Sequence, residues 1–220
     1  MSIWPKKTRT KILLALVVAL VAIYTWQANP REPTVVMYCT KYQGTPPARA
    51  CVETKRLSIP AAFGNVTVAD SLYELEFAYP SMQPWRSVSW LERSNTQKLT
   101  IWLHGVTLQT TQDIFASYFP GTPKPVHVAA IYGLDQYTLE GWGKRQLLLP
   151  IESSPRLFMD CAYGDDLNDL QGGNPYACTT TSYTNWHLKF VYTHQRALLP
   201  EWRTVHAKVH AFVESLVTTP

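Results

Sequence analysis

Glycine and charge are both scarce in this chain. Only 10 of its 220 residues are glycine, and no G-x-G-x-x-G or P-loop motif occurs, so a glycine-rich nucleotide loop is excluded. Charged residues make up 16%, as 20 basic and 16 acidic side chains. Four of the basic ones precede residue 30, and removing them (20 − 4) leaves 16 against 16. A neutral body of this kind argues against capture of nucleic acid or anionic lipid by overall charge.

Signatures of catalysis are also missing. The sequence has no G-x-S-x-G nucleophile motif, and cysteines held in disulfides cannot act as thiolates. We therefore expect no enzymatic activity and no cofactor. The composition is nevertheless that of a folded protein, because 46% of the residues are hydrophobic and 12% are aromatic.

The N-terminal residues 1–29 contain an uncharged apolar stretch, ILLALVVALVAIYTW, at positions 12–26. As a helix this stretch covers about 22 Å of a bilayer core that is ~30 Å thick. Lys11, Tyr24 and Trp26 suit the two interfaces and extend that reach. A cleaved signal peptide is the alternative, but Tyr24 to Gln27 do not form an A-x-A-like cleavage site. We expect an uncleaved, single-pass anchor in contact with the lipid bilayer.

The position of the basic residues predicts the topology. Lys6, Lys7, Arg9 and Lys11 all precede the apolar stretch, and positive charge keeps its side of a membrane helix in the cytoplasm. Residues 30–220 are then a periplasmic domain, held at the bacterial inner membrane.

Four cysteines fit that compartment. Cys39, Cys51, Cys161 and Cys178 form two pairs that are close in sequence, and an oxidising compartment favours disulfides. Three pairings are possible, of which Cys39–Cys51 with Cys161–Cys178 closes the shortest loops. A four-cysteine zinc site is the rival, although neither pair has C-x-x-C-like spacing.

Hydrophobic periodicity predicts an α+β domain of antiparallel strands with a C-terminal amphipathic helix. Alternating or β-branched segments indicate strands; these lie at 34–39, 51–59, 73–79, 99–103, 146–149, 156–161 and 186–192. A short helix is expected at 113–119. The terminal helix starts with Pro200 in its first turn and carries Trp202, Val205, Val209, Phe212 and Leu216 at three- and four-residue steps.

A weak repeat suggests two related halves. An L-x-x-P strand end, an alternating aromatic strand and a Pro–Trp–Arg element occur in the same order twice, starting at Leu57 and again at Leu147. Chance recurrence in a chain rich in proline and aromatics is the alternative.

Two clusters of side chains have the composition of metal sites. His206 and His210 have the i, i+4 spacing of metal ligands, with Glu214 on the same helix face. Ala207 stands where an H-E-x-x-H protease has its base, so we interpret the group as a polar, solvent-facing helix edge. The acidic segment around and after Cys161 could offer oxygen ligands to calcium, but its spacing does not match an EF-hand loop. Its candidate ligands are Asp160, Asp165, Asp166, Asn168 and Asp169. We expect no bound metal.

Five residues are candidate partner contacts. Three aspartates of the acidic segment lie between Cys161 and Cys178, and a disulfide-closed loop loses little entropy when a partner immobilises it. Trp85 and Trp90 lie in segments without strand periodicity, where large aromatics either anchor another protein or cap the end of the core. The contact candidates are Trp85, Trp90, Asp165, Asp166 and Asp169.

Several short motifs resemble immunity proteins of type VI secretion systems in Gram-negative bacteria. They are LSIP at 57–60, YPSM at 79–82, the loop from Cys161 to Cys178, and LLPEWR at 198–203 leading into the terminal helix. The likeness covers most of residues 50–217. It implies a periplasmic protein that blocks a toxin encoded nearby and catalyses nothing. Such proteins are commonly lipidated or secreted, whereas this chain is predicted to keep its anchor.

The sequence thus favours a membrane-anchored, periplasmic protein-binding module, most specifically an immunity protein that neutralises a periplasm-acting toxin. A structural or assembly subunit of an envelope complex is the alternative, and its membrane helix would make specific contacts. An envelope hydrolase is a third possibility, which would depend on His206, His210 or the Asp165 cluster.

Overall fold

The structure is a computed structural model that describes most of the chain after residue 31. The described residues are 32–43, 50–63, 67–69, 72–94, 96–105, 125–138, 145–152, 157–162, 177–185 and 188–218. Residues 34–220 form one compact unit. The expected anchor at 12–26 and the expected helix at 113–119 lie outside the described residues. Within the described ranges, no helix is both long and apolar enough to cross a bilayer.

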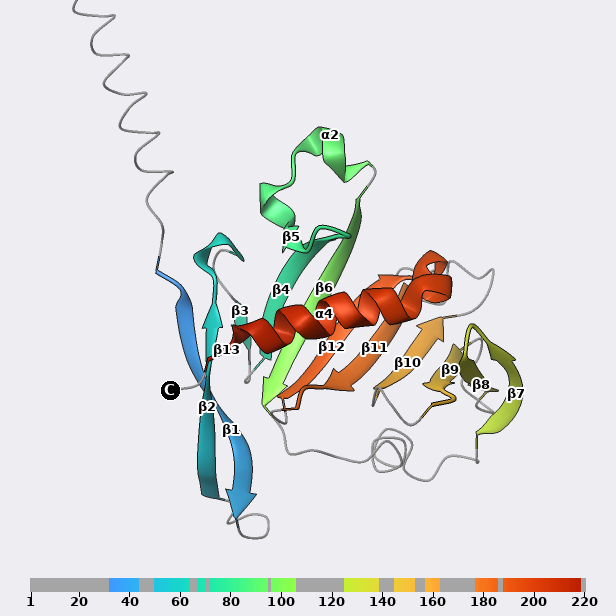
Figure 1. The fold of residues 1–220 in the computed structure, drawn as a ribbon, viewed down its shortest axis with the longest axis horizontal. Coiled ribbons are helices and arrows are strands. Elements are labelled where there is room, and N and C mark those ends of the chain that lie inside the picture. The colour runs from blue at the N-terminus through green and yellow to red at the C-terminus, as the bar shows by residue number, and fades with distance from the viewer. Residues whose placement is uncertain are drawn as a thin grey trace, which may run out of the picture. The chain divides into compact units, whose positions relative to one another are not determined.

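A ten-stranded antiparallel sheet forms the body of this unit (Figure 1). Its strands lie in the order β3 (Thr67–Ala69), β4 (Leu72–Tyr79), β6 (Gln97–Gly105), β12 (Leu188–Gln195), β11 (Ala177–Tyr183), β10 (Leu157–Ala162), β9 (Arg145–Pro150), β8 (Leu134–Thr138) and β7 (Val126–Ile131). The short β5 (Gln83–Pro84) pairs with β4 outside this path. A second sheet has three strands, β1 (Thr34–Gln43), β2 (Ala50–Ile59) and β13 (Val217–Thr218).

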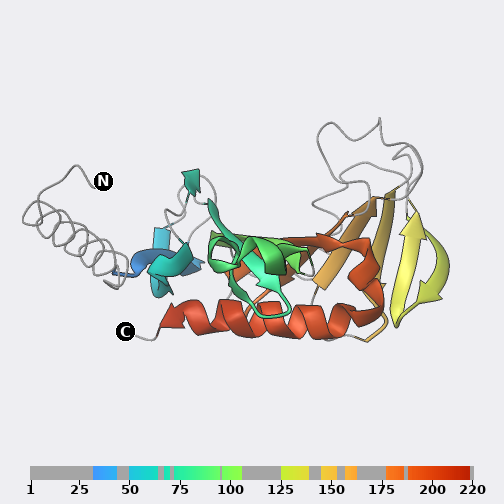
Figure 2. The same ribbon diagram turned by 90° about the horizontal axis from the view of Figure 1, so that it is seen from above.

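The C-terminal helix α4 (Trp202–Leu216) covers one face of the large sheet, as Figure 2 shows from above. Val205, Val209 and Val213 recur every four residues, so they lie on one side of the helix and are fully buried. They pack in a core cluster with the inward-facing residues of β4, β6 and β12, among them Phe77, Ile101 and Phe190. The helix therefore joins strands that are far apart in sequence.

A second core cluster lies at the other end of the helix. Trp202 is buried there with Leu134, Leu148, Met159 and the Cys161–Cys178 disulfide. A 3-10 helix, η3 (Arg196–Glu201), precedes α4 and adds Leu199 to the same cluster. Pro200 lies in this 3-10 helix, so the expected first-turn position in the α-helix is corrected by two residues.

The α+β class, the antiparallel strands and the terminal helix are confirmed. All the expected strands are present at nearly their predicted positions. The strands that were not predicted are β7, β8 and β11 and the short β3, β5 and β13. Both disulfides have the shortest-loop pairing, Cys39–Cys51 and Cys161–Cys178, and no cysteine is free to bind zinc.

The two segments of the apparent repeat correspond only in part, because their alternating aromatic strands, β4 and β12, both pair with β6, whereas the flanking elements differ. Leu57 belongs to β2 in the three-stranded sheet, whereas Leu147 belongs to β9 in the large sheet. The first Pro–Trp–Arg element leads into a three-residue 3-10 helix, and the second leads into α4. The flanking elements of the two segments therefore adopt different structures despite their similar sequences.

The turn between β7 and β8 is held by the start of α4. Tyr132 and Gly133 both have positive φ, 51° and 76°, as a two-residue type I′ hairpin turn requires. The indole Nε1 of Trp202 donates to the Tyr132 carbonyl at 2.8 Å. The Arg203 guanidinium lies 4.6 Å from the Trp202 ring centre and donates to Glu152 at 3.1 Å. A Cβ at position 133 would lie 2.8 Å from this guanidinium.

Changes at the two turn residues should have opposite effects on stability. Tyr132→Asn should stabilise the protein by roughly 0.5–1 kcal/mol, because Asn adopts positive φ more readily than an aromatic residue does. Gly133→Ala should destabilise it by about 1–2 kcal/mol, because alanine resists positive φ and its Cβ meets Arg203. Urea unfolding of the two variants measures both effects. Changes in the free energy of unfolding that have the same sign in both variants would contradict this account of the turn.

Polar side chains are buried between α4 and the sheet. His206 is 4% exposed, and its Nδ1 lies 3.3 Å from the Tyr192 hydroxyl. His194 is also buried, with Nε2 3.2 Å from Thr180 Oγ1 and Nδ1 3.0 Å from a backbone carbonyl. Burial, aided by the nearby His210, lowers the pKa of His206 to about 4, and burial lowers the pKa of His194 as well. Both imidazoles are therefore neutral in the folded protein at pH 7.

This burial predicts a loss of stability in mild acid. Between pH 6.5 and about 4 the unfolded chain protonates His206 while the folded protein does not, so stability falls as the pH is lowered through this range. The His206 contribution should approach roughly 3 kcal/mol at the acid end. His206→Gln cannot titrate but can still hydrogen-bond to Tyr192. Urea unfolding from pH 7.5 to 4 should show a shallower pH dependence for this variant, and an unchanged dependence would contradict the prediction.

Candidate partner-binding surface

The clearest exposed aromatic site lies in the segment that connects β4 to β6. These two strands are neighbours in the sheet, and the chain between them forms β5, the 3-10 helix η2 (Trp85–Ser87) and the short helix α2 (Trp90–Arg93). Figure 1 shows α2 beyond the end of the sheet and away from α4. The sheet therefore supports this connection without covering it.

Local hydrogen bonds fix the short helix. Ser89 and Glu92 form a capping box, in which the Ser89 hydroxyl accepts from the Glu92 amide and the Glu92 carboxylate accepts from the Ser89 amide at 3.2 Å. The same carboxylate accepts from the Ser89 hydroxyl at 2.8 Å, and these bonds lower the pKa of Glu92. Four residues are too few for an isolated helix to be stable, so the cap sets the conformation here.

The two candidate tryptophans have different environments. Trp85 is half-buried, and the Arg93 guanidinium lies 5.1 Å from its ring centre and donates to its carbonyl at 3.4 Å. Trp90 is 78% exposed and its neighbour Leu91 is 63% exposed. Trp85 thus contacts Arg93 within the segment, whereas Trp90 and Leu91 present apolar surface to water. Desolvating a large side chain on a rigid support is typical of binding hot spots.

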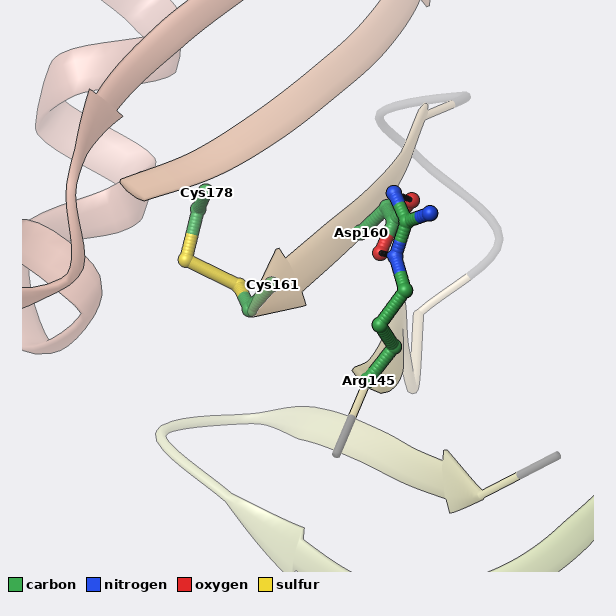
Figure 3. A network of polar contacts seen from close by, with 4 residues as sticks. All are labelled: Arg145, Asp160, Cys161 and Cys178. Carbon is green, nitrogen blue, oxygen red and sulfur yellow. Dashed lines mark hydrogen bonds and ion pairs between the residues drawn. A yellow bond between two sulfur atoms is a disulfide. The ribbon is translucent and has the colours of Figure 1, made fainter. Parts of the chain in front are cut away.

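The acidic candidates Asp165, Asp166 and Asp169 lie outside the described residues. The structure does describe the base of their loop, where Cys161 and Cys178 are directly paired across β10 and β11 and joined by the disulfide. The neighbouring Asp160 is bound by Arg145 through two hydrogen bonds, one of them from Nε at 3.0 Å (Figure 3).

Two opposing effects act on the pKa of Asp160. Burial raises its pKa, and the Arg145 guanidinium only partly offsets this rise. The disulfide and the ion pair use adjacent residues of β10, and Figure 3 shows them on different sides of that strand. Both ends of the loop are therefore fixed to the sheet.

His206 and His210 do not form the expected solvent-facing edge. The expectation was wrong for His206, which lies four residues after the buried Trp202 and three before the buried Val209, so it is on the side of the helix that faces the sheet. His210 is partly exposed, with Nε2 3.8 Å from Glu214 Oε1, and that oxygen accepts from the Asn185 amide at 2.9 Å. No group of three potential metal ligands occurs among the residues that the structure describes.

Leu91 and Tyr132 are among the exposed apolar residues that the sequence analysis did not single out. Leu91 is exposed beside Trp90. The one signal for this in the sequence is the Ser89–Glu92 capping box, which marks the start of a short helix that carries both side chains. Tyr132 is exposed at the β7–β8 turn, where an aromatic residue is held at positive φ without being buried. Such a conformation at a bulky residue is a reason to consider Tyr132 a contact as well.

Comparison with known proteins shows what the fold is similar to. No known family and no curated protein matches the sequence. The fold is similar to the solved structure of Smlt3025, described as an immunity protein of the Stenotrophomonas maltophilia type IV secretion system. The TM-score is 0.53 at 13% sequence identity, and the match covers 83% of this chain and 95% of that one. At this identity, the comparison establishes a shared fold.

Proposed function

We propose that this chain is an immunity protein that binds and neutralises a toxin delivered by a bacterial secretion system. The observation that carries the proposal is the fold shared with Smlt3025 over 95% of that protein. The two lines of support are independent, because the motifs at 57–60, 79–82 and 198–203 resemble immunity proteins in sequence alone. The sequence resemblance favours a type VI system, whereas the structural relative is assigned to a type IV system.

The proposed site of action is the periplasm, with the protein anchored in the inner membrane. The apolar stretch at 12–26 and the basic residues before it support this topology. Two disulfides also support it, because they form and persist in an oxidising compartment. An anchored binder would meet a periplasm-acting toxin close to its point of entry.

The proposed contact surface centres on Trp90 and Leu91. Both are exposed on a helix whose conformation the Ser89–Glu92 cap and the Arg93–Trp85 contact already fix. Binding through preformed structure avoids much of the entropy cost of ordering a loop. The mode of action is occlusion of the toxin by a protein that performs no chemistry itself.

Survival under toxin exposure tests the function. Cells that lack this protein should die when the cognate toxin reaches the periplasm, and expression of the full chain should restore growth. Replacing residues 1–29 by an unrelated single-pass anchor should preserve protection, because the anchor only tethers the binder. Normal survival without the protein would contradict the proposal. Loss of protection on exchange of the anchor would favour an assembly subunit instead.

Toxin affinity tests the surface. Trp90→Ala should weaken toxin binding at least tenfold, about 1.4 kcal/mol, and adding Leu91→Ala should weaken it further. Val126→Ala is the matched control, because Val126 is similarly exposed but lies on edge strand β7. Isothermal titration calorimetry measures all three variants. Equal affinities for Trp90→Ala and Val126→Ala would place the contact elsewhere.

A further inference from the structure

The edge strand β1 exposes apolar side chains on its outer face. Val36 and Tyr38 pack into the main core cluster. Because side chains alternate along a strand, Val35 and Met37 face the opposite way, and they are 42% and 59% exposed. Val52, on the paired strand β2, is also exposed. We name Val35, Met37 and Val52 the hairpin patch.

Among the residues that the structure describes, no strand pairs with the outer edge of β1. Strand β1 is ten residues long, lies at the end of the three-stranded sheet, and has Lys41 as its one charged residue. Exposed edges of this length and apolarity normally carry several charges or are covered by another element. The hairpin patch is therefore suited to contact an apolar environment.

The start of β1 lies close in sequence to the proposed anchor. The apolar stretch ends at Trp26 and β1 begins at Thr34, so the connector is residues 27–33. Fully extended, these residues reach at most about 25 Å. A tether this short keeps the membrane surface at a high effective concentration, so even weak apolar contacts with lipid would be populated.

The charge of the β1–β2 hairpin also favours contact with a membrane surface. Residues 34–59 contain four basic side chains and one acidic one, a net charge of +3. Residues 30–220 as a whole carry 16 of each sign, so the rest of this domain has a net charge of −3. The positive charge is thus local to the hairpin, and Arg56, which pairs with Met37, lies on the same face as the hairpin patch, where it complements anionic phospholipid. The charged residues are Lys41, Arg49, Lys55, Arg56 and Glu53.

We propose that the hairpin patch rests on the phospholipid surface of the membrane that holds the anchor. This inference depends on the anchor in the proposed function but not on the toxin. Figure 1 shows the β1–β2 hairpin well separated from α2, so contact with lipid leaves Trp90 and Leu91 accessible. The lipid contact would restrict the orientation of a tethered domain and keep its toxin-binding surface exposed.

Site-specific photo-crosslinking in cells without toxin tests this proposal. The full chain would carry p-benzoylphenylalanine in place of Met37. The matched control carries it in place of Ile151, which is 57% exposed and lies next to the β7–β8 turn of the large sheet. After irradiation, mass spectrometry should find phospholipid adducts at position 37 and at least fivefold fewer at position 151. Adducts to a second copy or to another protein at position 37, or equal lipid yields at both positions, would overturn the proposal.

A second probe tests the role of the apolar side chains. With p-benzoylphenylalanine in place of Val35, Met37→Asp should reduce the lipid adduct severalfold, while Met37→Leu should leave it unchanged. An unchanged yield in Met37→Asp would also overturn the proposal. Membrane sedimentation of the same cells reports the anchor separately, and a protein absent from the membrane fraction would refute the lipid contact. None of these readouts requires a toxin, so failure of the immunity function is distinguishable.

Discussion

Packing of α4 against the large sheet is the interaction on which the rest of the structure depends. The helix buries a valine every four residues over β4, β6 and β12, and it buries Trp202 in the second core cluster. One helix thus joins the two clusters. The Trp202 indole and the Arg203 guanidinium extend this support to the β7–β8 turn. Loss of the helix would uncover both cores at once.

The exposed apolar residues are notable against this well-packed interior. Where the helix covers the sheet, even the polar side chains Tyr192 and His206 contact one another. In contrast, Trp90 and Leu91 extend into water on a four-residue helix held by its cap. Folding alone gains little from a tryptophan in that position, whereas a large exposed side chain on a fixed support is typical of binding hot spots.

The sequence predicted those elements whose side chains separate cleanly into buried and exposed faces. Strand β4 alternates Leu75 and Phe77 with Glu74 and Glu76, and its period of two was sufficient to locate it. Strand β11 was missed because ACTTTSY is buried on both faces and has no polar alternation. The pairing of the cysteines followed from loop length, since each disulfide closes a short hairpin or loop.

The candidate site was harder to predict for physical reasons. Spacing placed His206 and His210 near one helix face, but burial depends on the distance to Tyr192 and Phe190, which only the tertiary structure sets. The absence of periodicity around Trp85 and Trp90 correctly indicated a segment outside the sheet strands. It could not show which indole would contact Arg93 and which would face water. The strained position of Tyr132 became visible only with its backbone angles.

The measurement that tests the central claim most directly is capture with the full-length, oxidised protein, in cells that also express the adjacent genes. We expect stoichiometric recovery of one neighbouring gene product, with the toxicity of that product abolished in the complex. Recovery of several envelope proteins, or of a partner whose toxicity is unchanged, would contradict an immunity function.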